Sequence, residues 1–307
     1  MTFLSLVFAL LLEQWRPLVD RRAVNAPLLA WADFLERKLN AGGVQQGLLA
    51  WIAVVVPAVL LAWFVYAILY SITPLLGLAF NVAVLYATTG FRQESHTFTE
   101  VNRALREGEL ATARRLLGEY RAEDCSALSA SDVARLTIED ALTVSHRNVF
   151  GPVFWFVLLP GPTGPVLYRA ARFLAAHWGA REDPDFGRFG EFARKAFSAL
   201  GWLPARATAV AFALVGDFAD ALDCWRTQAA AYPDPELGVV LASGAGAMRV
   251  RIGGAYPSGE RVQERPELGT GEPAEPVHLD ATIGLIWRAL VVWLGLIGVL
   301  SLVAAVS

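Results

Sequence analysis

The sequence predicts an all-α, polytopic helical integral membrane protein with cytoplasmic helical segments. Three observations support this prediction: 55% of the 307 residues are hydrophobic, only 18% are charged, and long uncharged stretches alternate with polar ones. Soluble domains usually carry roughly 25% charged residues. We find no internal repeat and no alternating strand pattern of useful length. The composition therefore argues against a purely cytosolic enzyme.

The first expected element is an N-terminal anchor. The run 2–12 is apolar, lacks a positive region before it, and is followed by Glu13 rather than by a small-residue cleavage site. This pattern favours an uncleaved anchor, and a cleaved signal peptide is the alternative. Residues 1–46 would then comprise the anchor and a cytoplasmic segment.

A transmembrane hairpin is expected over residues 47–90. The uncharged stretch 39–91 is too long for one span, since a bilayer core of about 30 Å takes roughly 20 helical residues. A Ser-Ile-Thr-Pro break at 71–74 divides it into helices of about 47–70 and 74–90. Basic residues on both sides place both flanks in the cytoplasm and the hairpin tip outside. They are Arg16, Arg21, Arg22, Arg37 and Lys38 before the hairpin, and Arg92, Arg103, Arg106, Arg114 and Arg115 after it.

Residues 91–148 predict a cytoplasmic helical module. Within 100–120, apolar residues recur at helical spacings that are broken only by Gly108, which indicates two short amphipathic helices meeting there. Ser129 or Ser131 would cap a further helix. The residues of that helix that are expected to face a core are Val133, Leu136 and Ile138.

Residues 149–216 are expected to form re-entrant or membrane-embedded helices. The apolar runs 149–159 and 166–176 are each shorter than a span, and a Pro- and Gly-rich breaker separates them. Non-helical backbone at membrane depth is tolerated only where protein covers it. The run 207–215 would complete a span only with the preceding Trp202-Leu203-Pro204. The broken segment also leaves a channel or transporter as an alternative, although no inverted repeat supports it.

The last third of the chain combines a cytoplasmic loop region, 217–280, with a C-terminal transmembrane helix, 281–307. Residues 256–276 are rich in Gly, Pro and Glu, which predicts a loop or partly disordered linker. The uncharged run 289–307 follows Arg288, whose side chain can reach the headgroups. We therefore interpret residues 1–307 as a single membrane domain made of these six segments.

The numbers and spacing of the charged residues, cysteines and histidines argue against nucleic acid binding, a disulfide scaffold and a metal site. Lys and Arg number 26 against 29 Asp and Glu, so there is no basic surplus to neutralise a nucleic acid backbone. The only cysteines, Cys125 and Cys224, lie far apart and read as free structural thiols. The sequence also predicts no metal site, because its histidines share no helical ligand spacing. They are His96, His146, His177 and His278.

A series of local motifs runs through nearly the whole chain. They are WADFLERKLN at 31–40, GELATARRLL at 108–117, RLTIE at 135–139, PVFW at 152–155, YRA at 168–170, WLPAR at 202–206, GD at 216–217 and MRVRIGG at 248–254. In this order the motifs resemble the CobD/CbiB family of adenosylcobinamide-phosphate synthases. The resemblance implies an inner-membrane protein that joins an aminopropanol or its phosphate to cobyric acid through an amide bond. The sequence is also similar to AmpE, a related membrane protein linked to β-lactamase induction.

The polar signature of that family, R-x-x-x-E-S-x-A-E-N-x-x-D-G, is only partly kept. Arg135 and Glu139 match it, but the second Glu falls on Thr143, the Asn on Val144 and the Asp on Arg147. Other family motifs also depart. The Asp-Asp pair falls on Phe197 and Ser198, Ser-Pro-Asn falls on Asp234, Pro235 and Glu236, Asn-Thr-Leu-Asp falls on 172–175, and the early Asp-Pro and His-Pro motif has no counterpart in 19–30.

These departures support two hypotheses. Each lost carboxylate removes on the order of a thousandfold in rate, so the leading hypothesis is an inner-membrane protein without synthase activity that has an AmpE-like regulatory role and binds a membrane or cytoplasmic protein partner. The alternative is an active synthase of cobalamin biosynthesis that binds a corrinoid and uses ATP and Mg²⁺. Its candidate catalytic residues are Glu139, Asp124, Asp217 and Asp280.

Overall fold

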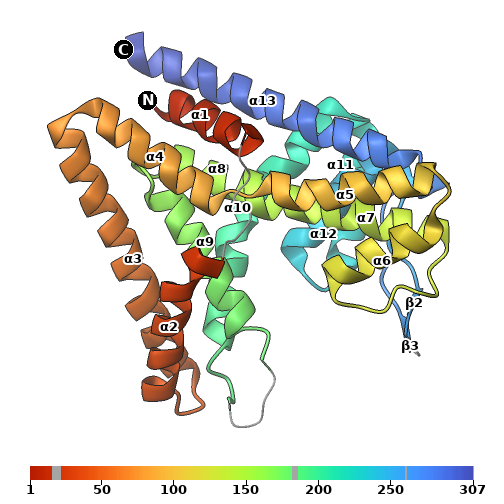
Figure 1. Ribbon diagram of the computed structural model, residues 1–307, viewed down its shortest axis with the longest axis horizontal. Helices are drawn as coiled ribbons and strands as arrows, with labels where there is room; N and C mark the ends of the chain where they lie inside the picture. Colours follow the sequence, from red (N-terminus) through yellow and green to blue (C-terminus); the bar gives the residue numbers. More distant parts are fainter. Residues whose placement is uncertain (16–21, 182–185, 260, 307) are drawn as a thin grey trace. The chain divides into compact units, whose positions relative to one another are not determined.

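Helices form most of the chain, and the all-α membrane fold class is confirmed (Figure 1). The computed structural model describes residues 1–15, 22–181, 186–259 and 261–306. Two of the basic residues before the expected hairpin, Arg16 and Arg21, lie outside the described residues, as do the side chains of Arg22 and Arg92 and part of the stretch 19–30.

The described residues fall into two units. Unit 1 comprises Met1–Gly90, Gly151–Pro204 and Ile297–Ser307, and unit 2 comprises Phe91–Phe150 and Ala205–Leu296. Both units are therefore assembled from stretches that are distant in sequence. The single domain expected over 1–307 stays a prediction.

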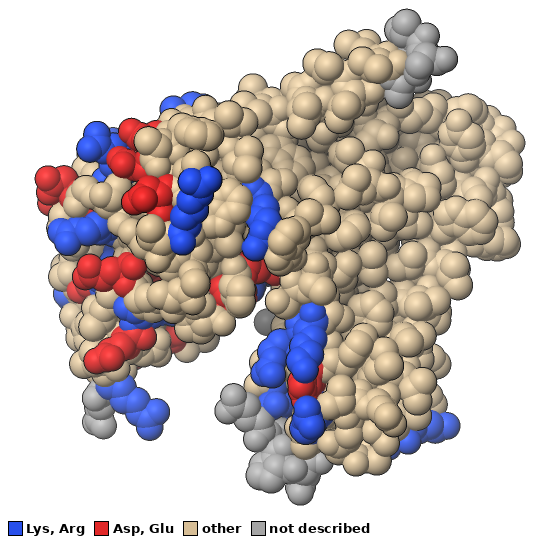
Figure 2. Space-filling model, turned by 180° about the vertical axis from the view of Figure 1, so that it is seen from behind, with Lys and Arg blue, Asp and Glu red and all other residues tan. Residues whose placement is uncertain are grey.

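Unit 1 contains the two helices expected to form the hairpin, and whether both cross a membrane stays a prediction. Helix α3, Val44–Ile72, and helix α4, Pro74–Thr88, are separated by Thr73 alone. Thr73 is extended, with φ −153°, and its Oγ1 accepts the Leu76 N–H at 3.2 Å. Pro74 occupies the first helical position, where a missing N–H costs nothing. In Figure 2 the surface over α3 and α4 is almost free of charged side chains, as their sequences require.

Unit 1 contains several further helices. They are α1 (Thr2–Trp15), α2 (Arg22–Leu39), α8 (Gly151–Leu158), α9 (Thr163–His177) and the first part of α10 (Glu191–Val215). Helices α8 and α9 correspond to the expected pair of short apolar helices, and Gly161 turns the chain between them at φ +60°. Whether α8 and α9 enter the bilayer stays a prediction.

Three helices in the described part of the chain are long and apolar enough to cross a membrane. They are α3, α10 and α13 (His278–Val306). Helix α10 passes through Pro204 and begins at Glu191, so the run 207–215 does belong to a helix of span length, one that starts well before Trp202. Helix α4 has only 15 residues, fewer than the roughly 20 that cross a bilayer core.

The core of unit 1 lies where α3 packs against α9 and the start of α10. Its fully buried side chains include Val55, Leu174, Trp178 and Phe189. Gly47 on α3 lets the backbones meet, because a Cβ at this position would clash with the Phe189 carbonyl oxygen. A small residue on α3 is needed here because the backbone of the turn before α10 comes so close.

Unit 2 begins with the helical module expected from the sequence. Helices α5 (Phe91–Arg106) and α6 (Leu110–Arg121) meet at Gly108, whose φ is +78°. Helix α7 (Ala130–Ser145) begins at Ser129, which forms a capping box with Asp132. Ser131, the other candidate cap, instead donates a hydrogen bond to the Ala274 carbonyl at 2.6 Å. The expected core residues of α7 are fully buried; they are Val133, Leu136 and Ile138.

Helix α7 continues directly into a π-helix, η1 (His146–Phe150), and further elements complete unit 2. They are the second part of α10, α11 (Phe218–Gln228), the 3₁₀ turn η2 (Ala229–Ala231), α12 (Pro235–Met248), four short strands and most of α13. Nearly every residue of α12 is buried, and small residues dominate it.

The described residues of 256–276 are mostly loop, as expected, but they also include short strands that the sequence did not predict. Strand β2 (Tyr256–Ser258) pairs antiparallel with β3 (Arg261–Gln263), and β1 (Val250–Arg251) pairs parallel with β4 (Glu272–Pro273). Two backbone hydrogen bonds, at 2.8 and 2.9 Å, join Ile252 to Leu268, and both side chains are buried. Strands of two or three residues are too short to leave an alternating pattern, so composition alone missed them.

We expect Gly47→Ala to destabilise the protein by about 1–3 kcal/mol, because the added methyl group overpacks a fixed backbone contact. Thermal unfolding in detergent micelles measures the effect. Gly295→Ala on α13 is the matched control, since a Cβ there meets nothing within 4 Å and alanine favours helix. Equal melting temperatures for the two variants would contradict the close approach at Gly47.

Candidate functional site

Glu139 holds a glycine turn of unit 2 against α7. Its side chain is buried, and its two carboxylate oxygens accept hydrogen bonds from the Gly253 N–H and from Arg265 Nη1, each at 2.8 Å. Gly253 has φ +78°, and a Cβ there would clash with the Pro266 carbonyl. Glu139 therefore fixes the position of the segment that carries β1 to β4.

The next residue of α7, Asp140, forms an ion pair with Arg121 of α6. Arg121 Nη1 lies 2.8 Å from both carboxylate oxygens of Asp140. Burial raises the pKa of Asp140 to about 6, and the Arg121 charge opposes this shift. The Tyr256 hydroxyl lies between two guanidinium groups, since it accepts hydrogen bonds from Arg121 at 3.3 Å and from Arg265 at 3.1 Å.

A second pair, which we call the buried pair, joins His146 of η1 to Glu236 of α12. The His146 Nε2 atom lies 2.7 Å from Glu236 Oε1, and the Nδ1 atom lies 3.0 Å from Thr208 Oγ1 of α10. The side chain of His146 is fully buried and that of Glu236 is 2% exposed. Both ring nitrogens are thus used, whichever tautomer the imidazole adopts.

A third pair, the accessible pair, joins Arg147 and Asp234. The Arg147 Nη2 atom lies 2.6 Å from Asp234 Oδ2, with side-chain exposures of 24% and 36%. Asp234 also caps α12, because its Oδ1 accepts the N–H groups of Glu236 and Leu237. The pKa of the Tyr232 hydroxyl is raised, first by burial and then by carboxylates including Glu139 and Asp234. These residues therefore share one electrostatic environment.

We call this set the polar cluster. It consists of Glu139, Asp140, His146, Arg147, Tyr232, Asp234, Glu236 and Arg265, and α7 with η1 supplies its first four members. The accessible pair is the part that a solute can reach, and the buried pair lies beneath the surface. Opposite charges next to each other at a partly open surface can bind a ligand that carries both charges.

The four candidate residues named from the sequence have separate partners. Glu139 belongs to the polar cluster, where both of its oxygens are engaged. Asp124 accepts the Ser126 N–H, and Asp217 caps α11 by accepting the Asp220 N–H. Asp280 binds Asn102 and Arg106 of α5. Each therefore has a local structural role, and a catalytic role for any of them stays a prediction.

Of the eight members of the polar cluster, sequence reasoning named only Glu139 as a candidate catalytic residue. Arg147, Asp234 and Glu236 each differ from the residue that the family pattern implies. Considered one at a time, each therefore looks like a loss. The missed signal is that Arg147 pairs with Asp234 and that Glu236 binds His146. Pairing across about 90 residues is not visible without coordinates.

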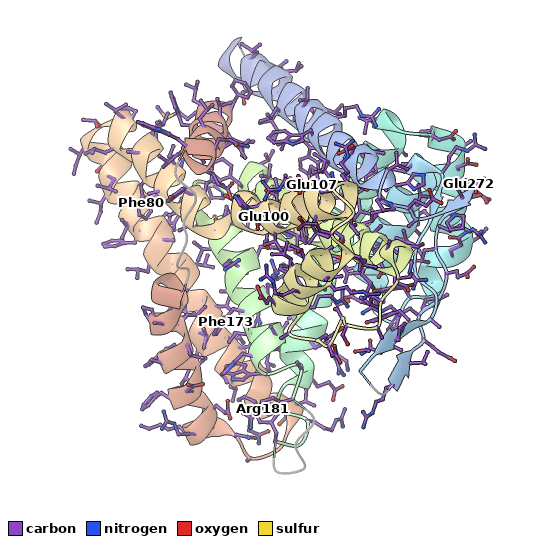
Figure 3. The ribbon with its side chains drawn as sticks, turned by 45° about the vertical axis from the view of Figure 1, so that its right-hand side comes forward. Phe80, Glu100, Glu107, Phe173, Arg181 and Glu272 are labelled. Carbon is purple, nitrogen blue, oxygen red and sulfur yellow. The ribbon has the colours of Figure 1, made fainter. Side chains whose placement is uncertain are left out.

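Unit 1 contains one further group that helical spacing did not predict. Ligand atoms of Asp33, Glu36 and His177 all lie within 4.8 Å of one another. His177 binds Asp33 at 2.8 Å, and Arg181 binds Glu36 at 2.6 Å. Figure 3 shows Arg181 beyond the end of α9 and Phe173 on α9, where Phe173 stacks on the His177 ring. These three side chains could hold a metal ion, so the absence of a metal site stays a prediction.

We expect Arg121→Met to destabilise the protein by about 3–5 kcal/mol, because it leaves the Asp140 carboxylate buried without its counter-charge. Thermal unfolding measures this loss. The matched control is Arg115→Met, whose partner Glu119 is well exposed and whose pair contributes about 0–1 kcal/mol. A loss no larger than the control's would contradict the buried ion pair.

The raised pKa of Asp140 also sets a pH dependence. Between pH 3.8 and about 6 the folded chain binds a proton at Asp140 that the unfolded chain releases, so this group's contribution to stability falls as pH rises through that window. Asp140→Asn should flatten this part of the stability–pH curve. An unchanged slope in the variant would show that another group titrates there.

Comparison with known proteins places the chain in one family. A family model described as CobD/Cbib protein matches residues 7–286. A cobalamin biosynthesis protein CobD of Stutzerimonas stutzeri is 37% identical over 299 residues, with 95% of each chain covered. The protein of the same name from Chromobacterium violaceum is 35% identical over 317 residues, covering 99% of this chain and 96% of its own.

Relatives of that name also occur at lower identity, such as one from Mycobacterium tuberculosis at 29% over 212 residues, 67% of each chain. No solved structure matches the chain. These comparisons favour the alternative reading of the sequence, cobalamin biosynthesis, and none of them supports the AmpE-like role without synthase activity. The chain belongs to the CobD/CbiB family.

Proposed function

We propose that this chain is an amide-forming enzyme of cobalamin biosynthesis, an adenosylcobinamide-phosphate synthase of the inner membrane that it crosses several times. The names of the relatives support the pathway. The three apolar helices and the basic residues beside the hairpin support the location. The observation that carries the proposal is the accessible pair of Arg147 and Asp234.

The departures from the family signature compensate one another. Where the resemblance implies Asp and Ser, this chain has Arg147 and Asp234, and the two side chains are 2.6 Å apart. Where it implies Asn, the chain has Glu236, which binds His146. If the site had only lost its activity, nothing would select for pairs of opposite charge. An unpaired buried charge destabilises the fold, whereas an apolar residue at the same position does not. We therefore interpret the site as one in which the charged residues occupy different positions, and not as one that has lost its charges.

The accessible pair suits the two reactants of an amide-forming step. One reactant carries a carboxylate, which a guanidinium binds in two-pronged geometry. The other carries an ammonium group, which a carboxylate binds and from which it can accept the proton that must leave before the nitrogen attacks. In this proposal Arg147 takes the first role and Asp234 the second. The amide group that forms is neutral, so the two side chains can pair again as the product leaves.

In this proposal ATP would activate the carboxylate as an acyl phosphate, and phosphate would leave when the amine nitrogen attacks the acyl carbon. The carboxylates of the polar cluster do not fit a magnesium site, because Glu139, Asp140 and Asp234 are each held by an arginine and Glu236 by His146. Magnesium prefers carboxylates that leave room for several water ligands. The proposal therefore assigns these four residues to charge pairing.

We expect the purified protein to form the amide from cobyric acid and aminopropanol phosphate with ATP and Mg²⁺. Arg147→Gln and Asp234→Asn should each lower kcat/KM about 10²-fold, because each removes the partner of one reactant. Product formation followed by mass spectrometry measures this effect. Glu119→Gln, on the exposed surface of α6, is the control.

Growth of a synthase-deletion strain on cobyric acid gives an independent readout. The proposal expects the wild-type chain to restore growth and Asp234→Asn to restore it poorly. If the wild-type chain forms no amide where a CobD relative does, and restores no growth, the synthase assignment is wrong.

A further inference from the structure

The buried pair would be an unfavourable choice if its only role were to stabilise the fold. Removing two ionisable side chains from water requires several kcal/mol, and a well-packed apolar pair is often as stable or more stable. His146 is nevertheless fully buried, and Glu236 almost so. Stability alone therefore gives no reason for these two residue types at these positions.

His146 ties together three elements of unit 2. It lies at the start of η1, and its ring reaches Thr208 of α10 on one side and Glu236 of α12 on the other. Helices α10 and α12 are joined again further along, where Ser243 donates a hydrogen bond to the Ala209 carbonyl at 2.9 Å. The first turn of α12 is thus held at a fixed place beside η1.

The buried pair and the accessible pair form a two-point clamp. Their members on η1, His146 and Arg147, are consecutive, and their partners on α12, Glu236 and Asp234, flank Pro235. Proline fixes its own φ angle. The two carboxylates on either side of it are therefore expected to move together. A π-helix inserts one extra residue into a helical turn, and such insertions are frequent at functional sites.

We propose that His146 is a positioning residue for amide formation: by holding Glu236 it sets where the Asp234 carboxylate meets Arg147. This inference rests on the synthase function proposed above. His146 touches no reactant, because it is fully buried. Its effect is geometric, and a displacement of a reacting group by about 1 Å can cost about 10²-fold in rate.

An apolar replacement separates positioning from folding. His146→Leu alone should lower the melting temperature, because Glu236 stays buried and loses its hydrogen bond to His146. The double variant His146→Leu with Glu236→Val should recover much of that loss, since it removes both polar groups. We expect the double variant to fold and insert, and yet to form amide with kcat/KM reduced about 10²-fold.

A conservative variant provides the rescue. The amide nitrogen of His146→Gln can occupy the place of Nε2 and donate to Glu236, so kcat/KM should stay within about tenfold of wild type while the double apolar variant loses far more. His96→Leu is the control, because His96 is an exposed residue of α5.

Two results would overturn the inference. If the double apolar variant recovers both its melting temperature and its kcat/KM, the buried pair is structural and His146 has no positioning role. If His146→Gln is as inactive as the double variant, the hydrogen bond to Glu236 is not what matters. A wild-type chain that forms no amide would instead reject the synthase function, and this inference with it.

Discussion

The organisation of unit 2 depends on one constraint: the carboxylates carried by and beside α7 are buried, and each must meet a cation or a donor inside the protein. Glu139 meets this requirement through Arg265 and the Gly253 N–H, and so fixes the segment of β1 to β4. Asp140 meets it through Arg121, and so fixes α6. The same demand at Glu236 brings η1 and α12 together. Charge pairing therefore decides how these elements are arranged.

Much of the fold could be predicted because its signals are local. Thr73 and Pro74 mark the hairpin turn, Gly108 marks the meeting of α5 and α6, and Ser129 begins α7. Each depends on a propensity that a few neighbouring residues determine. The strands of segment 256–276 could not be predicted in this way, because the contacts that hold the segment come from elsewhere in the chain. Leu268 is hydrogen-bonded to Ile252, and Arg265 is hydrogen-bonded to Glu139.

The candidate site was predictable only in part, for the same reason. Glu139 was found through the family signature, but its two oxygens are occupied by distant partners, which alters its role. The substitution to Arg147 looks like the loss of a carboxylate when position 147 is considered by itself. Asp234 supplies a carboxylate from another helix, and only the coordinates show that the two residues meet.

The cap of α12 bears on how such a site can change over generations. Serine and aspartate are both favourable residues at a helix N-cap. A lineage that already has Arg147 can therefore exchange serine for Asp234 without weakening the start of α12, and gains an ion pair by doing so. Epistasis of this kind lets one arrangement of charges replace another through intermediates that still fold, so a count of mismatches against a motif does not measure how many charges a site has lost.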